Sequence, residues 1–125
     1  IIQVKTGTGA WWGCAIEIAG GIGENLTGFS SGRLHFEIKG NTFSSFQLGF
    51  QTGSFAEGTQ TNNQVTFDSE SGYSISNEWK SYSISLTELD QGANLSDVTA
   101  LLFLIGDQDF DGKDIALKNI YYSKD

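Results

Sequence analysis

The sequence is short of several residue types, and each shortage argues against a class of protein. A single cysteine excludes an internal disulfide, and the apolar neighbours of Cys14 predict an inert thiol in the core. A single histidine, His35, and the lack of a strand-to-helix elbow carrying a serine argue against a Ser-His-Asp hydrolase. Proline is absent altogether, and the sequence offers no physical reason for this.

Basic residues and long apolar runs are also scarce. Seven Lys and Arg stand against fifteen Asp and Glu, which gives a formal net charge of −8 and a pI near 4.4. Such a chain repels a phosphate backbone, so neither nucleic acid nor an anionic membrane is expected as a partner. No apolar run is long enough to span a bilayer.

What remains is the composition of an all-β protein. The chain has 125 residues, the size of one domain, and residues 1–125 are expected to form a single module. Sixteen glycines, 13% aromatic residues and few helix-forming runs predict short strands joined by turns. Because the sequence starts with Ile1 and not with Met, we expect a fragment of a larger secreted protein. We also expect the module to be a monomer.

The clearest pattern runs from Gly32 to Gly40, where apolar and polar side chains alternate without a break. Leu34, Phe36 and Ile38 fall on one face, and the other face carries four polar side chains: Arg33, His35, Glu37 and Lys39. A side-chain period of two predicts a half-buried strand whose polar face is open to water or a ligand.

A second alternating stretch, Phe46 to Gln51, predicts another half-buried strand. We expect it to pair with the first through the turn at residues 41–44. The pairing would bring His35 and Glu37 close to Gln47 and Gln51 on one exposed sheet, where planar polar groups suit sugar hydroxyls. An ordinary solvated sheet face is the alternative interpretation.

Two tryptophans are candidate ligand contacts. Trp11 stands in register with the small residues Gly13 and Ala15, a geometry suited to stacking on a flat sugar ring; packing under a loop is the alternative. Trp79 precedes a strand and is either a packing residue or part of a binding platform.

Further strands are expected within Ile1–Lys5, Ala10–Ala19, Gln64–Phe67, Tyr73–Ser76, Trp79–Leu86, Val98–Ile105 and Ile115–Tyr122. The almost entirely apolar run Val98–Ile105 predicts a strand covered on both faces. The total of about eight or nine strands predicts an antiparallel β-sandwich.

Six segments in fixed order resemble a known kind of module. They are Leu26–Phe29, Gly32–Lys39, Phe46–Gly53, Trp79–Leu86, Leu95–Val98 and Ile115–Tyr122. From residue 26 onward the chain resembles the non-catalytic β-sandwich modules attached to bacterial β-glucanases. The resemblance implies a carbohydrate-binding module with a galactose-binding-like jelly roll, located outside the cell or at its surface and linked covalently to a catalytic domain. It implies a β-glucan as ligand, with β-1,3-glucan (laminarin) first and β-1,4- or mixed-linkage glucan next.

A calcium ion is the one cofactor to consider. Asp107, Asp109 and Asp111 alternate before Gly112, as in the opening of a calcium loop, but Lys118 stands where an EF-hand needs a bidentate Glu. A solvated acidic hairpin is the alternative. The resembling modules often use a last-strand carboxylate before an Asn for structural calcium, and here that position is also Lys118.

Two other function classes stay open. Glu17 and Glu37 could be proposed as the carboxylate pair of a small glycoside hydrolase, although any acidic sandwich offers such pairs. A structural or adhesion module without affinity for glycans would share the fold, because fold does not fix function.

Overall fold

The structure is a computed structural model. It describes residues 2–5, 11–17, 23–40, 45–54, 56–68, 72–107 and 114–124. Within the strands, it leaves out the side chains of Ile2, Val4, Lys5, Trp11, Trp12, Glu17 and Asp107.

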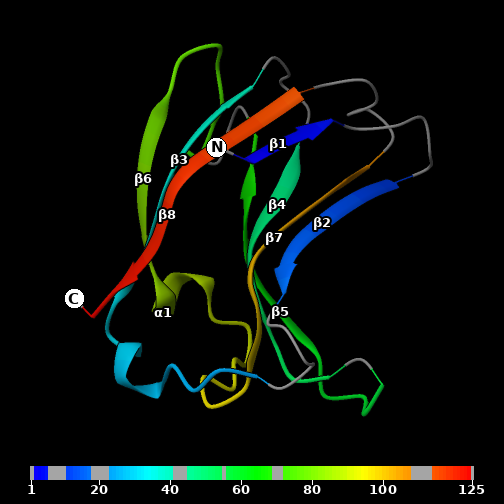
Figure 1. Cartoon of the computed structure of the whole chain (residues 1–125), viewed down its shortest axis with the longest axis vertical. Coiled ribbons are helices and arrows are strands. Elements are labelled where there is room, and N and C mark those ends of the chain that lie inside the picture. The colour runs from blue at the N-terminus through cyan, green and yellow to red at the C-terminus, as the bar shows by residue number, and fades with distance from the viewer. Residues whose placement is uncertain are drawn as a thin grey trace.

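Eight strands make up the described part of the fold, together with two short helices (Figure 1). The strands are β1 (Ile2–Lys5), β2 (Trp11–Glu17), β3 (Arg33–Gly40), β4 (Phe46–Thr52), β5 (Thr61–Phe67), β6 (Lys80–Ser85), β7 (Val98–Asp107) and β8 (Asp114–Ser123). A 3-10 helix spans Thr27–Phe29, and α1 spans Leu86–Leu89. Ser85 caps α1, because its side-chain oxygen accepts a hydrogen bond from the backbone N–H of Glu88 at 3.2 Å.

The strands form two four-stranded sheets, which we call sheet A (order β1-β8-β3-β6) and sheet B (order β2-β7-β4-β5). All neighbouring strands are antiparallel. The two sheets lie face to face with the apolar cluster between them. The predicted antiparallel β-sandwich is therefore confirmed.

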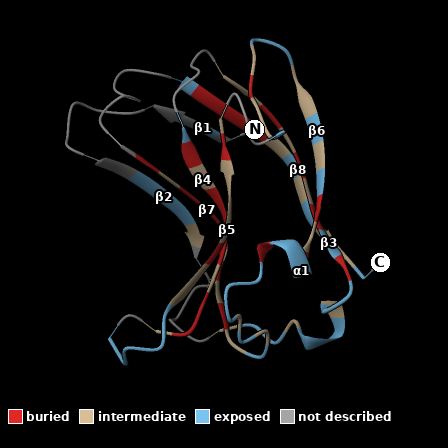
Figure 2. Cartoon of the chain, turned by 180° about the vertical axis from the view of Figure 1, so that it is seen from behind, coloured by how far each residue is buried: buried red, intermediate tan, exposed pale blue. Residues whose placement is uncertain are grey.

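The core follows from the alternation seen in the sequence. On β3, Leu34, Phe36 and Ile38 are at most 1% exposed, as predicted. Sheet B contributes inward side chains from β4 and β7: Phe46, Leu48, Phe50, Leu102 and Leu104. Figure 2 shows that the buried positions lie mainly on the strands, whereas most of the described connecting residues are not buried.

One predicted neighbour relation is wrong. β3 pairs with β6 and β8 in sheet A, whereas β4 pairs with β5 and β7 in sheet B. The chain crosses from one sheet to the other between Gly40 and Phe46, so that the apolar faces of these two strands meet across the core. Their polar faces consequently point in opposite directions.

The prediction for Cys14 is also wrong, because this residue is exposed. Its register partner Leu104 is a core residue, so Cys14 lies on the inward side of β2. β2 is an edge strand, and at this edge the two sheets leave a hollow of about 220 Å³ between Cys14, Gln3 and Leu117. The interior is not closed there.

Two polar side chains join parts of the sandwich from within. Asn63 is fully buried; its Nδ2 donates to the carbonyl of Thr61 at 3.3 Å, and its Oδ1 accepts from the backbone N–H of Gln91 at 2.9 Å. The hydroxyl of Tyr122, on β8, donates to the carbonyl of Leu101, on β7, at 2.5 Å and so links the two sheets. No helix in the described part of the chain has the length and apolar character needed to cross a membrane.

Candidate functional site

The structure divides the predicted ligand contacts between the two outer faces of the sandwich. His35 and Glu37 lie on β3, on the outer face of sheet A, while Gln47 and Gln51 lie on β4, on the outer face of sheet B. The prediction that all four residues share one exposed sheet is therefore wrong, since the core separates the two pairs. Each face has to be considered as a site of its own.

A row of amide side chains crosses the outer face of sheet B. Gln51 stands opposite Asn62, and Gly49, between the two glutamines of β4, stands opposite Gln64. The Nε2 of Gln51 donates to the Oδ1 of Asn62 at 3.0 Å. We call Gln47, Gln51, Asn62 and Gln64 the amide row; all four are half-buried. The sequence did not single out Asn62 and Gln64, because their partners on β4 emerge only from the strand pairing.

Beside the amide row, β7 and β2 continue the same face with small and apolar residues. Phe103 stands opposite Ala15 on β2 and Gly49 on β4, and Ile105 stands opposite Gly13. Gly13 and Ala15 are exposed, as expected of small residues that leave room for a sugar ring. Phe103 is only 1% exposed although it does not belong to the cluster between the sheets, so it is covered on the outer side.

Trp11 occupies the first position of β2, opposite Asp107, and its backbone is in the same alternate row as Gly13 and Ala15. Its side chain lies outside the described residues. The predicted stacking role of Trp11 therefore stays a prediction.

The described side chains on the outer face of sheet B are uncharged, and the face is curved. None of the described side chains on it is charged, although the chain as a whole carries −8. Figure 1 shows β2 and β7 bending so that the outer side of sheet B is the concave one. A concave, uncharged face with amide donors and acceptors suits a neutral ligand rich in hydroxyl groups.

The outer face of sheet A is different, because it is charged and carries an exposed aromatic ring. Tyr121 on β8 is 55% exposed, and its ring stacks on that of His35 with 4.4 Å between centroids and 7° between planes. The side-chain carboxylate of Glu37 accepts a hydrogen bond from the side-chain amide of Asn119. These residues line a hollow of about 460 Å³.

Trp79, directly before β6, is covered by two ammonium groups. The Nζ of Lys118 lies 4.2 Å and that of Lys39 lies 5.0 Å from its ring centroid. These cation–π contacts favour the packing interpretation of Trp79. Its predicted ligand contact is not tested by the structure.

The acidic residues give no calcium site in the described part of the chain. The side chains of Asp107, Asp109 and Asp111 lie outside the described residues, so the calcium loop stays a prediction. Among the residues that are described, no three His, Cys, Asp or Glu come together to hold a metal ion. The ammonium of Lys118, held over Trp79, does not fit the calcium position that the resembling modules use.

Burial raises the pKa of the side-chain hydroxyls of two tyrosines, Tyr73 and Tyr122. Burial is the main cause that raises the pKa of Tyr122 above its ordinary value. Burial, and then the hydrogen bond from its hydroxyl to the carboxylate of Glu88, raise the pKa of Tyr73 to about 12. Both hydroxyls thus stay protonated where an unfolded chain would begin to ionise.

Residues 1–124 match the family described as Carbohydrate binding domain 30. The chain belongs to this family of carbohydrate-binding modules. It is therefore a non-catalytic domain that binds polysaccharide. The carboxylate pair considered for hydrolysis fails on geometry as well, since Glu17 lies in sheet B and Glu37 in sheet A. No curated protein matches the sequence.

Solved structures share the fold of this module. The family 30 module of the cellulosomal cellulase Cel9D-Cel44B of Clostridium thermocellum aligns with 22% identity and a TM-score of 0.73, over 98% of this chain and 72% of that one. A second family 30 module gives 21% identity and a TM-score of 0.74, over 98% and 65%. The family 11 module of the cellulosomal cellulase Lic26A-Cel5E of Clostridium thermocellum aligns with 15% identity and a TM-score of 0.60, over 94% of this chain and 71% of that one.

Proposed function

We propose that this module binds a β-glucan chain across the outer face of sheet B. The observation that carries the proposal is the amide row, four half-buried Gln and Asn side chains on two adjacent strands. Each amide offers two donors and an acceptor with two lone pairs, and together they match the alternating hydroxyls of a sugar chain.

The amide row is held in place before a ligand arrives. Gln51 is fixed by its hydrogen bond to Asn62, and half-burial restricts all four side chains. A side chain that is already ordered loses less conformational entropy on binding. The described side chains around the amide row are uncharged, so binding there does not require the desolvation of a charged protein group.

An apolar surface next to the amide row completes the site. Gly13 and Ala15 leave space above β2, and Ile105 offers a half-buried apolar side chain. We assign the stacking contact with a sugar ring to Trp11, which lies in the same alternate row as Gly13 and Ala15, at the first position of β2. Site and ligand together predict modest affinities, with dissociation constants in the micromolar to millimolar range.

The ligand class follows from two lines of support. The resemblance described above puts β-1,3-glucan first, while two structural neighbours are modules of proteins named as cellulases, which brings in β-1,4-glucan. We further propose that residues 1–125 are one monomeric module of a longer extracellular glycoside hydrolase. Tethering would raise the local concentration of substrate at the catalytic domain.

Affinity electrophoresis tests the proposal. The chain is run in native gels that contain laminarin, hydroxyethylcellulose, mixed-linkage β-glucan or mannan. We expect retardation by at least one β-glucan, and the panel ranks the linkages. The double variant Gln47→Ala/Gln51→Ala should weaken binding by about tenfold or more, since it removes two pre-ordered polar contacts.

Gln91→Ala is the matched control, because Gln91 is an exposed glutamine in a loop and, within the described part of the chain, only its backbone N–H is hydrogen-bonded. It should bind as the unchanged chain does. Melting temperatures of all variants should agree within a few degrees, which separates lost contacts from lost folding.

Trp11→Ala should abolish retardation with little loss of stability. Retained binding in this variant would remove Trp11 from the site. Absence of retardation of the unchanged chain by every β-glucan would overturn the proposal and favour a structural or adhesion module.

A further inference from the structure

The hollow on the outer face of sheet A lies on the side of the sandwich opposite the amide row. Its volume of about 460 Å³ falls within the range of about 300 to 1,000 Å³ that is usual for small-molecule sites. Six outward-facing side chains from β3, β6 and β8 line it: His35, Glu37, Ser81, Ser83, Asn119 and Tyr121.

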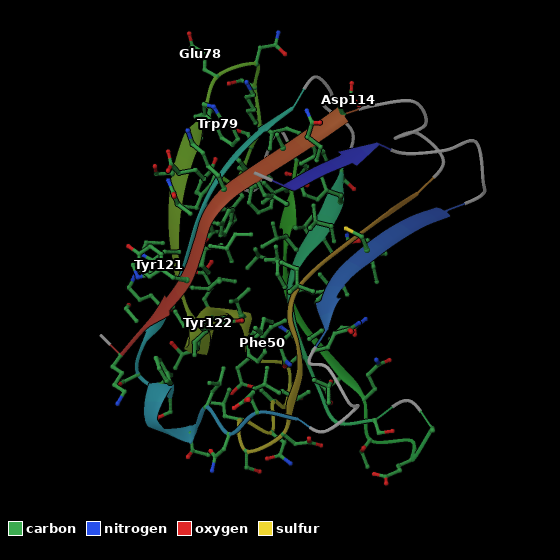
Figure 3. All side chains as sticks on the ribbon, viewed as in Figure 1. Phe50, Glu78, Trp79, Asp114, Tyr121 and Tyr122 are labelled. Atoms are coloured by element: carbon green, nitrogen blue, oxygen red, sulfur yellow. The ribbon has the colours of Figure 1, made fainter. Side chains whose placement is uncertain are left out.

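Tyr121 forms one wall of this hollow. Of the large hydrophobic side chains in the described part of the chain, it alone is exposed. His35 covers one face of its ring and is itself held by a 2.7 Å hydrogen bond between Nε2 and the hydroxyl of Ser123. Figure 3 shows Tyr121 projecting away from sheet B, whereas its neighbour Tyr122 points inward toward Phe50. The second face of the Tyr121 ring is therefore open and fixed in position.

A β-bulge places a polar pair next to that ring. His35 stands opposite Tyr121 and Glu37 opposite Lys118, so that β8 has two residues, Asn119 and Ile120, where β3 has one. Asn119 has φ +53°, the one positive φ among the described non-glycine residues. Bulges redirect side chains, and here the amide of Asn119 reaches the carboxylate of Glu37. Asn tolerates this left-handed backbone better than most residues do, at some cost in strain.

The chemistry of the hollow matches a pyranose unit. An open aromatic face takes the apolar C–H side of a sugar ring. A carboxylate that accepts, beside an amide that both donates and accepts, suits two neighbouring hydroxyls, and the exposed hydroxyls of Ser81 and Ser83 lie on the next strand. Arg33 is already engaged with Ser83, through Nε to the hydroxyl at 2.7 Å and Nη2 to the carbonyl at 2.8 Å. A negative charge on Glu37 within the hollow disfavours an anionic ligand.

We propose that this hollow is a second carbohydrate site, which takes one or two neutral pyranose units of a polysaccharide by stacking on Tyr121 and hydrogen bonding to Glu37 and Asn119. The ligand class rests on membership in the family and not on the role proposed for the amide row. Two sites on opposite faces let one module contact two glycan chains, and the gain in avidity requires no further contact.

Proton–nitrogen correlation NMR of the whole chain tests this inference, because it reads both faces in one spectrum. Cellohexaose, laminarihexaose and mannohexaose are titrated separately to about 10 mM, a range that detects millimolar dissociation constants. We expect saturable shifts of the backbone amides of Ser83, Asn119 and Tyr121. These shifts should persist in the Gln47→Ala/Gln51→Ala variant, which removes the proposed site on sheet B.

Three variants assign the contacts. Tyr121→Ala should weaken binding at sheet A by about tenfold, while Tyr121→Phe should retain it because the ring remains. Asn119→Gly keeps a residue that accepts the positive φ and removes only the amide, so it should weaken binding by about threefold or more without unfolding the chain. All three should leave the shifts of the amide row unchanged.

Two outcomes overturn the inference. One is that none of the three oligosaccharides shifts the sheet A resonances, in which case the exposed ring has another use, such as contact with a neighbouring domain. The other is that Tyr121→Ala binds at sheet A as tightly as the unchanged chain. Either result leaves the proposal for sheet B standing, because the amide row is observed independently.

Discussion

The two outer faces of this sandwich are built from the same kind of alternating strand, yet they differ in charge, in shape and in the use of aromatic residues. The outer face of sheet B is concave, its described side chains are uncharged, and its described aromatic, Phe103, is buried. The outer face of sheet A carries Arg33, Glu37, Lys39 and Lys118, and its aromatic, Tyr121, is open. The difference shows that an alternating pattern specifies an outward face but not its chemistry, which depends on the neighbouring strands.

The largest effect is expected from the two aromatics. Phe103→Ala should lower the free energy of unfolding by about 3 to 5 kcal/mol, as is usual for removal of a buried Phe. Tyr121→Ala should cost less than about 1 kcal/mol because the ring is exposed. Urea denaturation of both variants measures the difference. Equal losses would show that the two faces are covered to the same extent.

Next in size is the effect of placing a charge on the neutral face. Gln51→Lys replaces an amide of the row by an ammonium that a bound glycan would have to desolvate, so affinity in β-glucan gels should fall by about tenfold or more. Gln91→Lys makes the same change in charge in an exposed loop and should bind normally. Unchanged affinity of the Gln51 variant would mean that the neutrality of sheet B has no part in binding.

The next effect is a dependence of stability on pH that comes from two tyrosines. Tyr122 joins the sheets through Leu101, and the pKa of its hydroxyl and that of Tyr73 are raised, the latter to about 12. A group whose pKa is raised by folding stabilises the fold below its unfolded pKa and loses that effect as pH rises toward its folded pKa. Stability should therefore be constant up to about pH 10 and then fall, by up to about 1.4 kcal/mol per pH unit for the more buried Tyr122 and by less for the more exposed Tyr73.

Urea denaturation between pH 8 and pH 12, the upper limit being the pKa of about 12 of Tyr73, measures this slope. Tyr122→Phe should be less stable at neutral pH, because the carbonyl of Leu101 loses its donor, and should show a shallower slope above about pH 10. An unchanged slope would show that folding does not raise the pKa of the Tyr122 hydroxyl.

The smallest effect concerns Trp79. Lys118→Gln removes the closer ammonium from its ring and should cost about 0.5 to 1 kcal/mol, and Lys39→Gln, the more distant one, should cost less. Neither change should alter retardation by a β-glucan bound to sheet B. Loss of binding in both would return Trp79 to the candidate ligand contacts.

The outward direction of the Tyr121 side chain could be predicted only in part from the sequence. Tyr121 and Tyr122 are neighbours in a strand, so one of them had to point outward. Which of the two does so depends on the bulge at Asn119, because an extra residue reverses the alternation along β8. No periodic pattern in the sequence indicates the extra residue of a β-bulge. For this reason Asn119 was not among the predicted site residues.

The sequence by itself determined the fold class, the inward residues of β3 and β4, and a net charge of −8 that disfavours anionic partners. These properties are local, because alternation and charge are written along the chain. Only the tertiary structure decided that β3 and β4 lie in opposite sheets, that Gln51 meets Asn62, and that Cys14 lies at an open edge. The physical reason is that a period of two fixes which side of a strand is buried, while the neighbour of that strand is chosen by packing between segments far apart in the chain.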